Sequence, residues 1–209
     1  MKPNPQLILA SESPRRRELL YALGAPFRVI PARVNEVPLR NEAPARFALR
    51  AAAEKAAVVA KKHPLAFVLS ADTIVVIDAK ILGKPRDRAH ARRMLSMLEG
   101  REHRVYTSVC LMCGKLGYRD TGIEMTRVTF RPLTRNEIAA YVRTGECDDK
   151  AGAYAAQGAG MLLIDRVAGS FSNVVGLPMT RVVSMLTKAK VITACALGPR
   201  FYRLVGGKR

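Results

Sequence analysis

The chain has few acidic residues, few aromatic residues and no tryptophan. Its 209 residues include 17 Asp and Glu against 35 Lys and Arg, which gives a formal net charge of +18. Such an excess attracts nucleic acid, nucleotides and acidic membranes. Six Tyr and six Phe provide little for base stacking, and no zinc-finger, RNP-type or basic-zipper motif is present. Nucleic-acid binding is therefore an alternative supported by charge alone, and we expect none beyond non-specific attraction.

The sequence also lacks an apolar run long enough to cross a bilayer. The first six residues lead into an apolar run that is too short and too quickly polar for a signal peptide. Hydrophobic residues make up 49% of the chain, enough for a substantial core. We therefore expect a soluble, cytoplasmic protein with no membrane partner.

Candidate ligands for a structural metal are scarce. Cys110 and Cys113 form a CxxC pair, but no second pair follows. If the segment is a strand, residues three apart point to opposite faces and cannot share a metal, which favours ordinary buried thiols. His63, His90 and His103 have no partners at ligand spacing, so we expect them on the surface.

Helix-like and strand-like segments alternate along the chain. Apolar, β-branched runs predict strands, and longer segments of helical propensity or periodicity predict helices. The pattern predicts an α/β protein with a mixed sheet flanked by helices. We expect one catalytic domain over residues 1–188 and a basic C-terminal tail of unknown role over 189–209. We expect helices over residues 43–62, 85–98 and 179–186, and a further helix that begins with a capping box at 134–137. We expect strands over residues 7–9, 67–77, 105–112 and 124–131. Segment 169–178 is expected to form a loop, a short strand and the entry to the last helix.

The first helix start has the features of an anion site. A short apolar run at 7–9 is followed by Ser13, a good N-cap, and by Pro14, which suits the first helical position. Three arginines at 15–17 follow, although the positive end of the helix dipole repels cations. A bound polyanion would offset that repulsion, since a helix N-terminus also offers unpaired N–H groups. The alternative is a solvated basic turn.

Asp72 interrupts the apolar run 68–76. A buried, unpaired acid costs several kcal/mol, so we expect Asp72 at a strand end or bulge, facing a cleft and paired with a partner. The functional interpretation is a general base or a metal-binding carboxylate. The alternative is a structural acid that is paired with the backbone or with an arginine.

Two further segments suggest ligand contact. Gly83-Lys84-Pro85 resembles a tight turn that presents a lysine, but it lacks the other residues of a Walker A loop. Small residues surround Lys150 and Gln157 in segment 149–158, which allows backbone to approach a ligand closely. Gln157 has both a donor and an acceptor, as recognition of a base edge needs. The alternatives are a solvated Lys84 and a flexible surface loop.

Five segments together resemble the Maf family of nucleoside triphosphate pyrophosphatases. The resemblance implies an α/β fold related to the inosine triphosphate pyrophosphatases, and commonly a homodimer. It also implies that a nucleoside triphosphate is hydrolysed between its α- and β-phosphates with a divalent metal cation, Mg²⁺ or Mn²⁺. The matching segments are 11–16, 71–75, 83–85, 149–158 and 174–178, in the order of the family.

The resemblance also implies roles for individual residues. Asp72 would be the catalytic residue and, with Glu36, would hold the metal; whether Asp72 acts as base or as metal ligand stays open. Arg16, Thr73 and Gln157 match the branch of the family that acts on dTTP and UTP. The sister branch, which acts on 7-methyl-GTP, has Trp after the Ser-Pro pair and Ser after the catalytic Asp. The implied substrate-binding residues are Ser13, Arg15, Arg16, Glu36, Lys55, Thr73, Lys84, Lys150 and Gln157.

Overall fold

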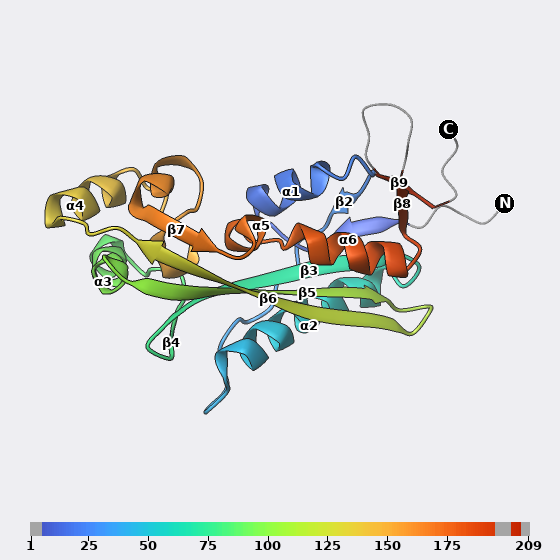
Figure 1. Cartoon of the computed structure of the whole chain (residues 1–209). Helices are drawn as coiled ribbons and strands as arrows, with labels where there is room; N and C mark the ends of the chain where they lie inside the picture. The colour runs from blue at the N-terminus through green and yellow to red at the C-terminus, as the bar shows by residue number, and fades with distance from the viewer. Residues whose placement is uncertain (1–5, 195–201, 206–209) are drawn as a thin grey trace. The chain divides into compact units, whose positions relative to one another are not determined.

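The computed structural model describes residues 6–194 and 202–205, and the chain divides into two compact units (Figure 1). The first unit comprises Met1–Asp72, Ser108–Ile123 and Gly176–Arg209. The second comprises Thr73–Thr107 and Glu124–Val175. Asp72 is thus the last residue of a segment of the first unit, and its chain neighbour Thr73 begins the second.

The described residues form a mixed seven-stranded sheet and a separate two-stranded one. The larger sheet has the order β2-β1-β3-β5-β6-β7, with β4 paired to β3, and the smaller consists of β8 and β9. β1 is parallel to β2 and β3, whereas the β3–β4 and β6–β7 pairs are antiparallel. The elements are β1 (Leu7–Leu9), α1 (Pro14–Tyr21), β2 (Arg28–Val29), α2 (Pro44–Lys62), β3 (Phe67–Ile77), β4 (Lys80–Leu82), α3 (Arg88–Leu98), β5 (Glu102–Cys113), β6 (Tyr118–Phe130), α4 (Arg135–Arg143), η1 (Ala151–Ala153), η2 (Gly158–Leu163), β7 (Ile164–Ala168), α5 (Phe171–Val175), α6 (Met179–Lys188), β8 (Ile192–Ala194) and β9 (Tyr202–Leu204).

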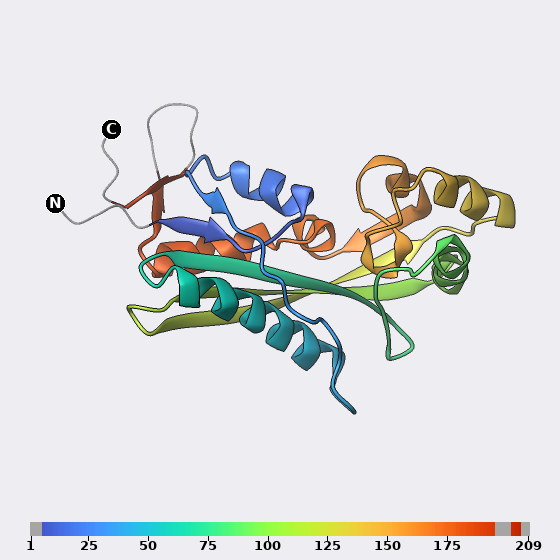
Figure 2. The ribbon, with the colours of Figure 1, turned by 180° about the vertical axis from the view of Figure 1, so that it is seen from behind.

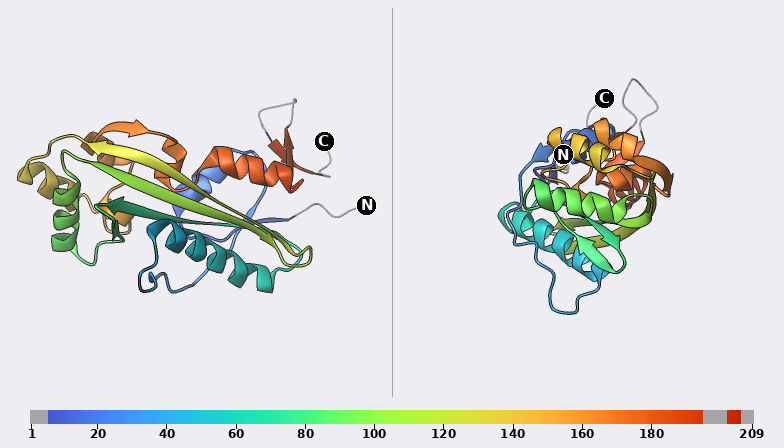
Figure 3. Two further views of the ribbon diagram at one scale, coloured as in Figure 1. Left: turned by 60° about the horizontal axis from the view of Figure 1, so that its bottom comes forward. Right: turned by 90° about the vertical axis from the view of Figure 1, so that its left-hand side faces the viewer.

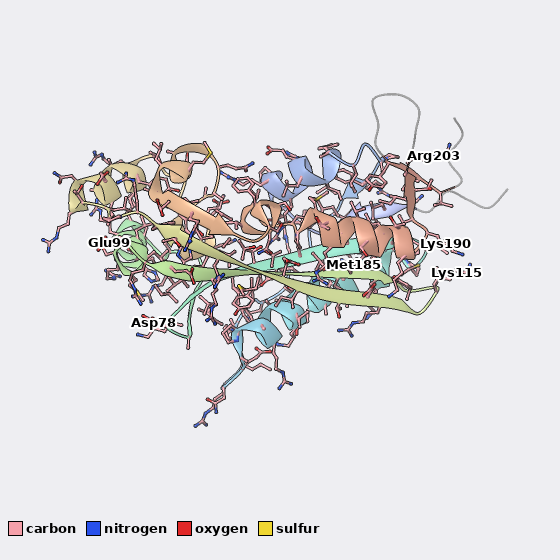
Figure 4. All side chains as sticks on the ribbon, in the orientation of Figure 1. Asp78, Glu99, Lys115, Met185, Lys190 and Arg203 are labelled. Carbon is pink, nitrogen blue, oxygen red and sulfur yellow. The ribbon has the colours of Figure 1, made fainter. Side chains whose placement is uncertain are left out.

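In the first unit, helices cover both faces of the strands. α1 and α6 lie on one face and α2 on the other (Figures 1 and 2), and the turned view of Figure 3 again places α2 opposite α6. Strand side chains alternate between these layers: Leu7 and Leu9 pack with α1 and α6, whereas Ile8 packs against α2. Met185, labelled in Figure 4, belongs to the α6 side of this core.

In the second unit, α3 and α4 pack against each other and against strand residues. Leu95 of α3 and Val142 of α4 are buried in one cluster with Val105 and Phe130. The predicted capping box of α4 is present: Thr134 accepts from the backbone N–H of Glu137, whose carboxylate accepts from the N–H of Thr134.

Most predicted elements are confirmed, but the expectations for segment 171–175 and for His103 are wrong. Segment 171–175 is the helix α5 rather than a short strand, because the Ser170 hydroxyl accepts from the N–H of Asn173 and caps it. His103 is buried in β5 rather than exposed, where its Nε2 lies 2.8 Å from the Tyr154 hydroxyl. Cys110 and Cys113 are buried on opposite faces of β5, as predicted.

Part of the predicted tail 189–209 lies outside the described residues. The described part contributes β8 and β9, which pair antiparallel. The division into a catalytic domain over 1–188 and a tail stays a prediction. Within residues 6–194 and 202–205, no helix combines the length and apolar character needed to cross a bilayer.

Candidate functional site

The buried carboxylate of Asp72 is bonded to a buried lysine. Asp72 lies within β3 and not at its end, so that part of the prediction is wrong. A partner was predicted without its identity, and it is Lys55, whose Nζ lies 2.7 Å from Asp72 Oδ1. Asp72 is 4% exposed and Lys55 7%. The pairing explains how an acid is accommodated within an apolar strand.

Glu36 completes a cluster of three charged groups. Its Oε1 lies 2.9 Å from Lys55 Nζ, and its side chain is 43% exposed. One ammonium group therefore bonds two carboxylates, one buried and one facing solvent. Sequence reasoning identified all three members, and the structure brings them together.

Two buried serines fix the helix that carries Lys55. Ser70 of β3 donates to the carbonyl of Ala52 at 2.5 Å, and Ser108 of β5 donates to the carbonyl of Ala48. Both carbonyls belong to α2, one and two turns before Lys55. A serine that replaces an apolar residue in a buried strand was the available sequence signal, but its partner lies far away in the sequence.

Burial raises the pKa of Asp72 above its ordinary value. Lys55 and Arg16 oppose this shift by favouring the charged carboxylate, and the like charge of Glu36 adds to it. A carboxyl with a raised pKa is a better proton acceptor than an ordinary aspartate, because it holds the proton more strongly. Perturbed groups of this kind gather at catalytic sites.

Arg16 links the first helix start to the strand that carries Asp72. Its NH1 donates to the carbonyl of Ala71 at 2.9 Å, and its Nε donates to the carbonyl of Gly176 at 2.8 Å. Burial lowers the pKa of this guanidinium, whereas Asp72 and Glu36 raise it; it stays charged, as arginines do in proteins.

The predicted cap of this helix is also present, since the Ser13 hydroxyl accepts from the N–H of Arg16 at 3.4 Å and Pro14 occupies the first turn. Arg15 is half-buried in the same turn. Ser11, which belongs to the matching segment 11–16 but had no role assigned from the sequence, accepts from the N–H of Ser13 and from Arg16 NH1.

The carboxylates of Asp72 and Glu36 are suitable ligands for a divalent cation. Each has a second oxygen besides the one bonded to Lys55, and Mg²⁺ commonly uses one or two carboxylates together with substrate phosphates. Among the described residues, no three His, Cys, Asp or Glu side chains gather as a protein-only metal site. The donor set therefore suits a metal that binds together with a polyphosphate.

In the second unit, the two lysine-bearing motifs meet. The N–H of Gly152 donates to the carbonyl of Gly83 at 3.0 Å, which connects the segment of Lys150 to the turn of Lys84. Lys84 is exposed, and Lys150 is half-buried and paired with Asp149. Burial raises the pKa of Asp149, but Lys150 and Lys84 outweigh it and the net shift is downward.

Gln157 occupies the position directly before the short helix η2 and is half-buried. Glu146 holds the following turn: its carboxylate accepts from the N–H of Ala159 at 3.0 Å and from that of Gly160 at 3.2 Å. Sequence reasoning did not identify Glu146. The segment is therefore fixed by hydrogen bonds rather than a loose surface loop.

Thr73 begins a chain of neutral hydrogen bonds in the second unit. Its hydroxyl lies 2.9 Å from that of Thr107, and the Thr107 hydroxyl donates to the backbone carbonyl of Asn173 at 2.9 Å. Sequence reasoning missed Thr107 and Asn173. Both are fully buried polar residues, and their partners are more than 30 residues away in the chain.

The fold is an α/β architecture that is also found in the Ham1 protein of Staphylococcus aureus. That structure superposes with a TM-score of 0.51 and 12% identity, covering 88% of this chain and 100% of the other. At this identity the similarity concerns the fold alone, and it confirms the predicted fold class.

The sequence comparison identifies the family. The model of the family described as Maf-like protein matches residues 6–189, so the chain belongs to the Maf family. A relative from Myxococcus xanthus, named dTTP/UTP pyrophosphatase, is 51% identical over 88% of this chain and 92% of its own. A relative of the same name from Symbiobacterium thermophilum is 50% identical over 88% and 93%, and one from Deinococcus radiodurans is 46% identical over 90% and 94%.

Proposed function

We propose that this Maf family protein is a nucleoside triphosphate pyrophosphatase that hydrolyses dTTP and UTP to the monophosphate and pyrophosphate. The observation that carries the proposal is the buried carboxylate of Asp72, bonded to Lys55 beside Glu36. The name shared by relatives that are about half identical over nearly their whole length supports the substrate class.

Asp72 accepts the proton of the attacking water in this mechanism. Its raised pKa suits this role, and the ammonium of Lys55 orients the carboxylate through Oδ1. Lys55 also keeps a positive charge beside the position where negative charge develops on the scissile phosphate. Glu36, on the exposed side of Lys55, keeps that ammonium in place through its own ion pair.

A divalent cation, Mg²⁺ or Mn²⁺, belongs to the proposal. Asp72 and Glu36 are the residues that would hold it, and when bound it would neutralise phosphate charge and polarise the phosphoryl oxygens. Arg15 and the helix start capped by Ser13 supply further positive potential for the phosphates. Arg16 holds the carbonyl of Ala71, next to Asp72, and so also positions the catalytic strand.

The second unit contains four further residues of the proposed substrate-binding set. Lys84 and Lys150 surround Asp149 and provide cations for phosphate without a Walker A loop. Gln157 supplies the donor and acceptor of a base edge. Thr73 is joined to Asp72 by a peptide bond, so a substrate that binds Asp72 lies within a few ångströms of the Thr73 backbone.

Pyrophosphate release from a nucleotide panel tests the proposal. The purified chain is incubated with UTP, dTTP, CTP, GTP and 7-methyl-GTP, with Mg²⁺, Mn²⁺ or a chelator. We expect metal-dependent release that is fastest with UTP and dTTP. Faster turnover of GTP or 7-methyl-GTP would contradict the assigned branch but not the enzyme class. No turnover, with salt-sensitive binding of duplex DNA instead, would favour the charge-driven alternative.

We also propose that the protein is a homodimer, as the family resemblance implies, and that it acts in the cytoplasm. Light scattering coupled to gel filtration measures the mass in solution, which should be twice the 22.9 kDa of one chain. Fractionation of cells that express the chain tests the location. A monomer mass at micromolar concentration would contradict the proposed homodimer.

A further inference from the structure

The segment that carries Glu36 belongs to no helix or strand. It comprises residues 31–43, between β2 and α2. Glu36 bonds Lys55, but its side chain is 43% exposed, and ion pairs that reach solvent contribute little by themselves. Backbone outside a helix or strand moves unless other groups fix it. The position of the Glu36 carboxylate therefore depends on what holds this segment.

Arg50 of α2 holds the segment with three hydrogen bonds. Its Nε donates to Glu42 Oε1 at 2.8 Å and its NH2 to Glu42 Oε2 at 2.7 Å, which makes a two-pronged ion pair. NH2 also donates to the carbonyl of Val37 at 2.9 Å. Val37 directly follows Glu36, so the Cα atoms of the two residues are about 3.8 Å apart. The guanidinium therefore fixes the chain next to the Glu36 carboxylate.

Both members of this ion pair are themselves held in place. Glu42 Oε2 also accepts from the N–H of Leu39 at 2.9 Å, and the N–H of Glu42 donates to the Leu39 carbonyl at 3.1 Å. The hydrogen bond from Arg50 is the main cause that lowers the pKa of Glu42 to about 2, so the pair is charged at neutral pH. Arg50 NH1 bonds Glu54 at 3.0 Å, and its guanidinium carbon lies 5.5 Å from the ring centre of buried Phe47.

We propose that Arg50, paired with Glu42, is a positioning residue that holds Glu36 against Lys55. The inference rests on the proposed function and adds to it two residues that act through Glu36. A carboxylate that is already in place loses less conformational freedom when a metal binds, so the metal binds more tightly. Loss of the Arg50–Glu42 pair should therefore raise the metal concentration that the enzyme needs, more than it slows the enzyme when metal is saturating.

The two carboxylate partners of Arg50 provide a matched pair of variants. Glu42→Ala removes the partner within the segment and Glu54→Ala the partner on α2, so only the first change releases the segment. Arg50→Lys keeps the charge and removes the planar fork that makes the two-pronged pair. For each protein, pyrophosphate release from UTP is measured over a range of Mg²⁺ concentrations. Amide hydrogen exchange of residues 31–43 is measured without metal or nucleotide.

We expect Glu42→Ala and Arg50→Lys to raise the Mg²⁺ concentration for half-maximal turnover by about tenfold or more, the usual scale when a residue that orients a metal ligand is lost. The change in kcat at saturating Mg²⁺ should be smaller. Amides of residues 31–43 should exchange about tenfold faster in these two variants, while those of β3 keep their wild-type rates. Glu54→Ala should match the wild type in both measurements.

Three outcomes would overturn the inference. They are wild-type values in Glu42→Ala, equal changes in Glu42→Ala and Glu54→Ala, and faster exchange with an unchanged Mg²⁺ requirement, which would mean that the pair is structural only. If Arg50→Lys does not fold, Glu42→Ala decides alone, since Glu42 lies outside the helices and strands. If Glu42→Ala does not fold, Glu42→Gln, which keeps the size and loses the charge, takes its place.

Failure of the proposed function is a separate result. A wild-type protein that releases no pyrophosphate from UTP or dTTP overturns that function. An active wild-type protein whose Mg²⁺ requirement does not respond to Glu42→Ala overturns only the role of Arg50 and Glu42.

Discussion

The two units hold their polar groups in opposite ways. The first buries charge: Lys55 and Asp72 lie 2.7 Å apart, with Glu36 on the other side of the ammonium. The second buries neutral donors and acceptors, with Asn173 at the centre of bonds to Val105 and Thr126. Buried charges are expensive in water-free surroundings, whereas a satisfied neutral network adds to stability.

The difference predicts a division between activity and stability. The pKa of Asp72 is raised by burial, so the folded state binds its proton more strongly than the unfolded state does. Above the ordinary pKa of an aspartate, stability therefore falls as pH rises toward the folded value. The fold is thus less stable at neutral pH than below the ordinary pKa of an aspartate, as far as Asp72 is concerned. The neutral network around Asn173 should contribute to stability and not to the chemical step.

The largest expected effect is on turnover in the first unit. Asp72→Asn keeps the shape of the side chain and removes its charge, so kcat should fall by roughly 10²-fold or more. The free energy of unfolding at pH 7 should fall as well, because the buried ammonium of Lys55 then keeps only Glu36 as a carboxylate partner. Pyrophosphate release and urea unfolding of the same preparation give the two values.

Asp78→Asn is the matched control for this prediction. Asp78, labelled in Figure 4, lies on the turn between β3 and β4 and bonds Arg101 at 2.8 Å on the surface. Exposed pairs of this kind contribute little to stability, so turnover and unfolding should stay near the wild-type values. Near-normal turnover in folded Asp72→Asn would show that Asp72 is a structural acid.

Substitution in the neutral network should change stability alone. Asn173→Ala removes two side-chain bonds and leaves the buried carbonyl of Val105 without its donor. We expect the free energy of unfolding to fall by about 2–3 kcal/mol. Asn136→Ala, an exposed position on α4, is the control and should change little. A loss below about 0.5 kcal/mol in Asn173→Ala would remove the contrast between the units.

The charged cluster could be predicted from the sequence, and the neutral network could not. An aspartate inside an apolar strand is conspicuous by itself, and Lys55 and Glu36 followed from the family resemblance. Thr107 and Asn173 are ordinary polar residues until folding places them beside each other, 66 residues apart in the chain. Their hydrogen bonds depend on long-range pairing, which local sequence patterns do not show.

The fold shows the same limit. The N-cap at Ser13 and the capping box at Thr134 are local signals, and both are confirmed. His103 was expected on the surface because it has no ligand partner. The strand alternation that buries Val105 and Thr107 extends back to it and was the missed signal. Two adjacent valines in α5 favoured a strand, but the Ser170 hydroxyl accepts from the N–H of Asn173 and stabilises a helix there.

His103 makes the stability of the fold depend on pH with a sign opposite to that of Asp72. Burial lowers the pKa of His103 to about 4, against about 6.5 in an unfolded chain. Below pH 6.5 the unfolded state binds the proton and the folded state does not, so stability is lost as pH falls toward 4. Between pH 7 and pH 5 the loss is about 2 kcal/mol.

His103→Gln should remove that loss, which urea unfolding at pH 7 and pH 5 measures. His63→Gln, at the half-buried end of α2, is the control and should keep the wild-type difference. An equal acid sensitivity in His103→Gln and wild type would place the titrating group elsewhere.

The smallest expected effect concerns close packing where the two lysine motifs of the second unit meet. Gly152 has a φ of +70°, and a Cβ atom there would lie 2.9 Å from Cγ2 of Val75. Gly117 has a φ of +57° with nothing within 4 Å of such an atom. Both Gly→Ala changes incur the strain of positive φ, but only Gly152→Ala also crowds a buried strand. Gly152→Ala should therefore lose at least about 1 kcal/mol more stability than Gly117→Ala. Equal losses in urea unfolding would mean that the motif segment yields freely, and that the hydrogen bond from Gly152 to Gly83 does not fix the position of Lys84.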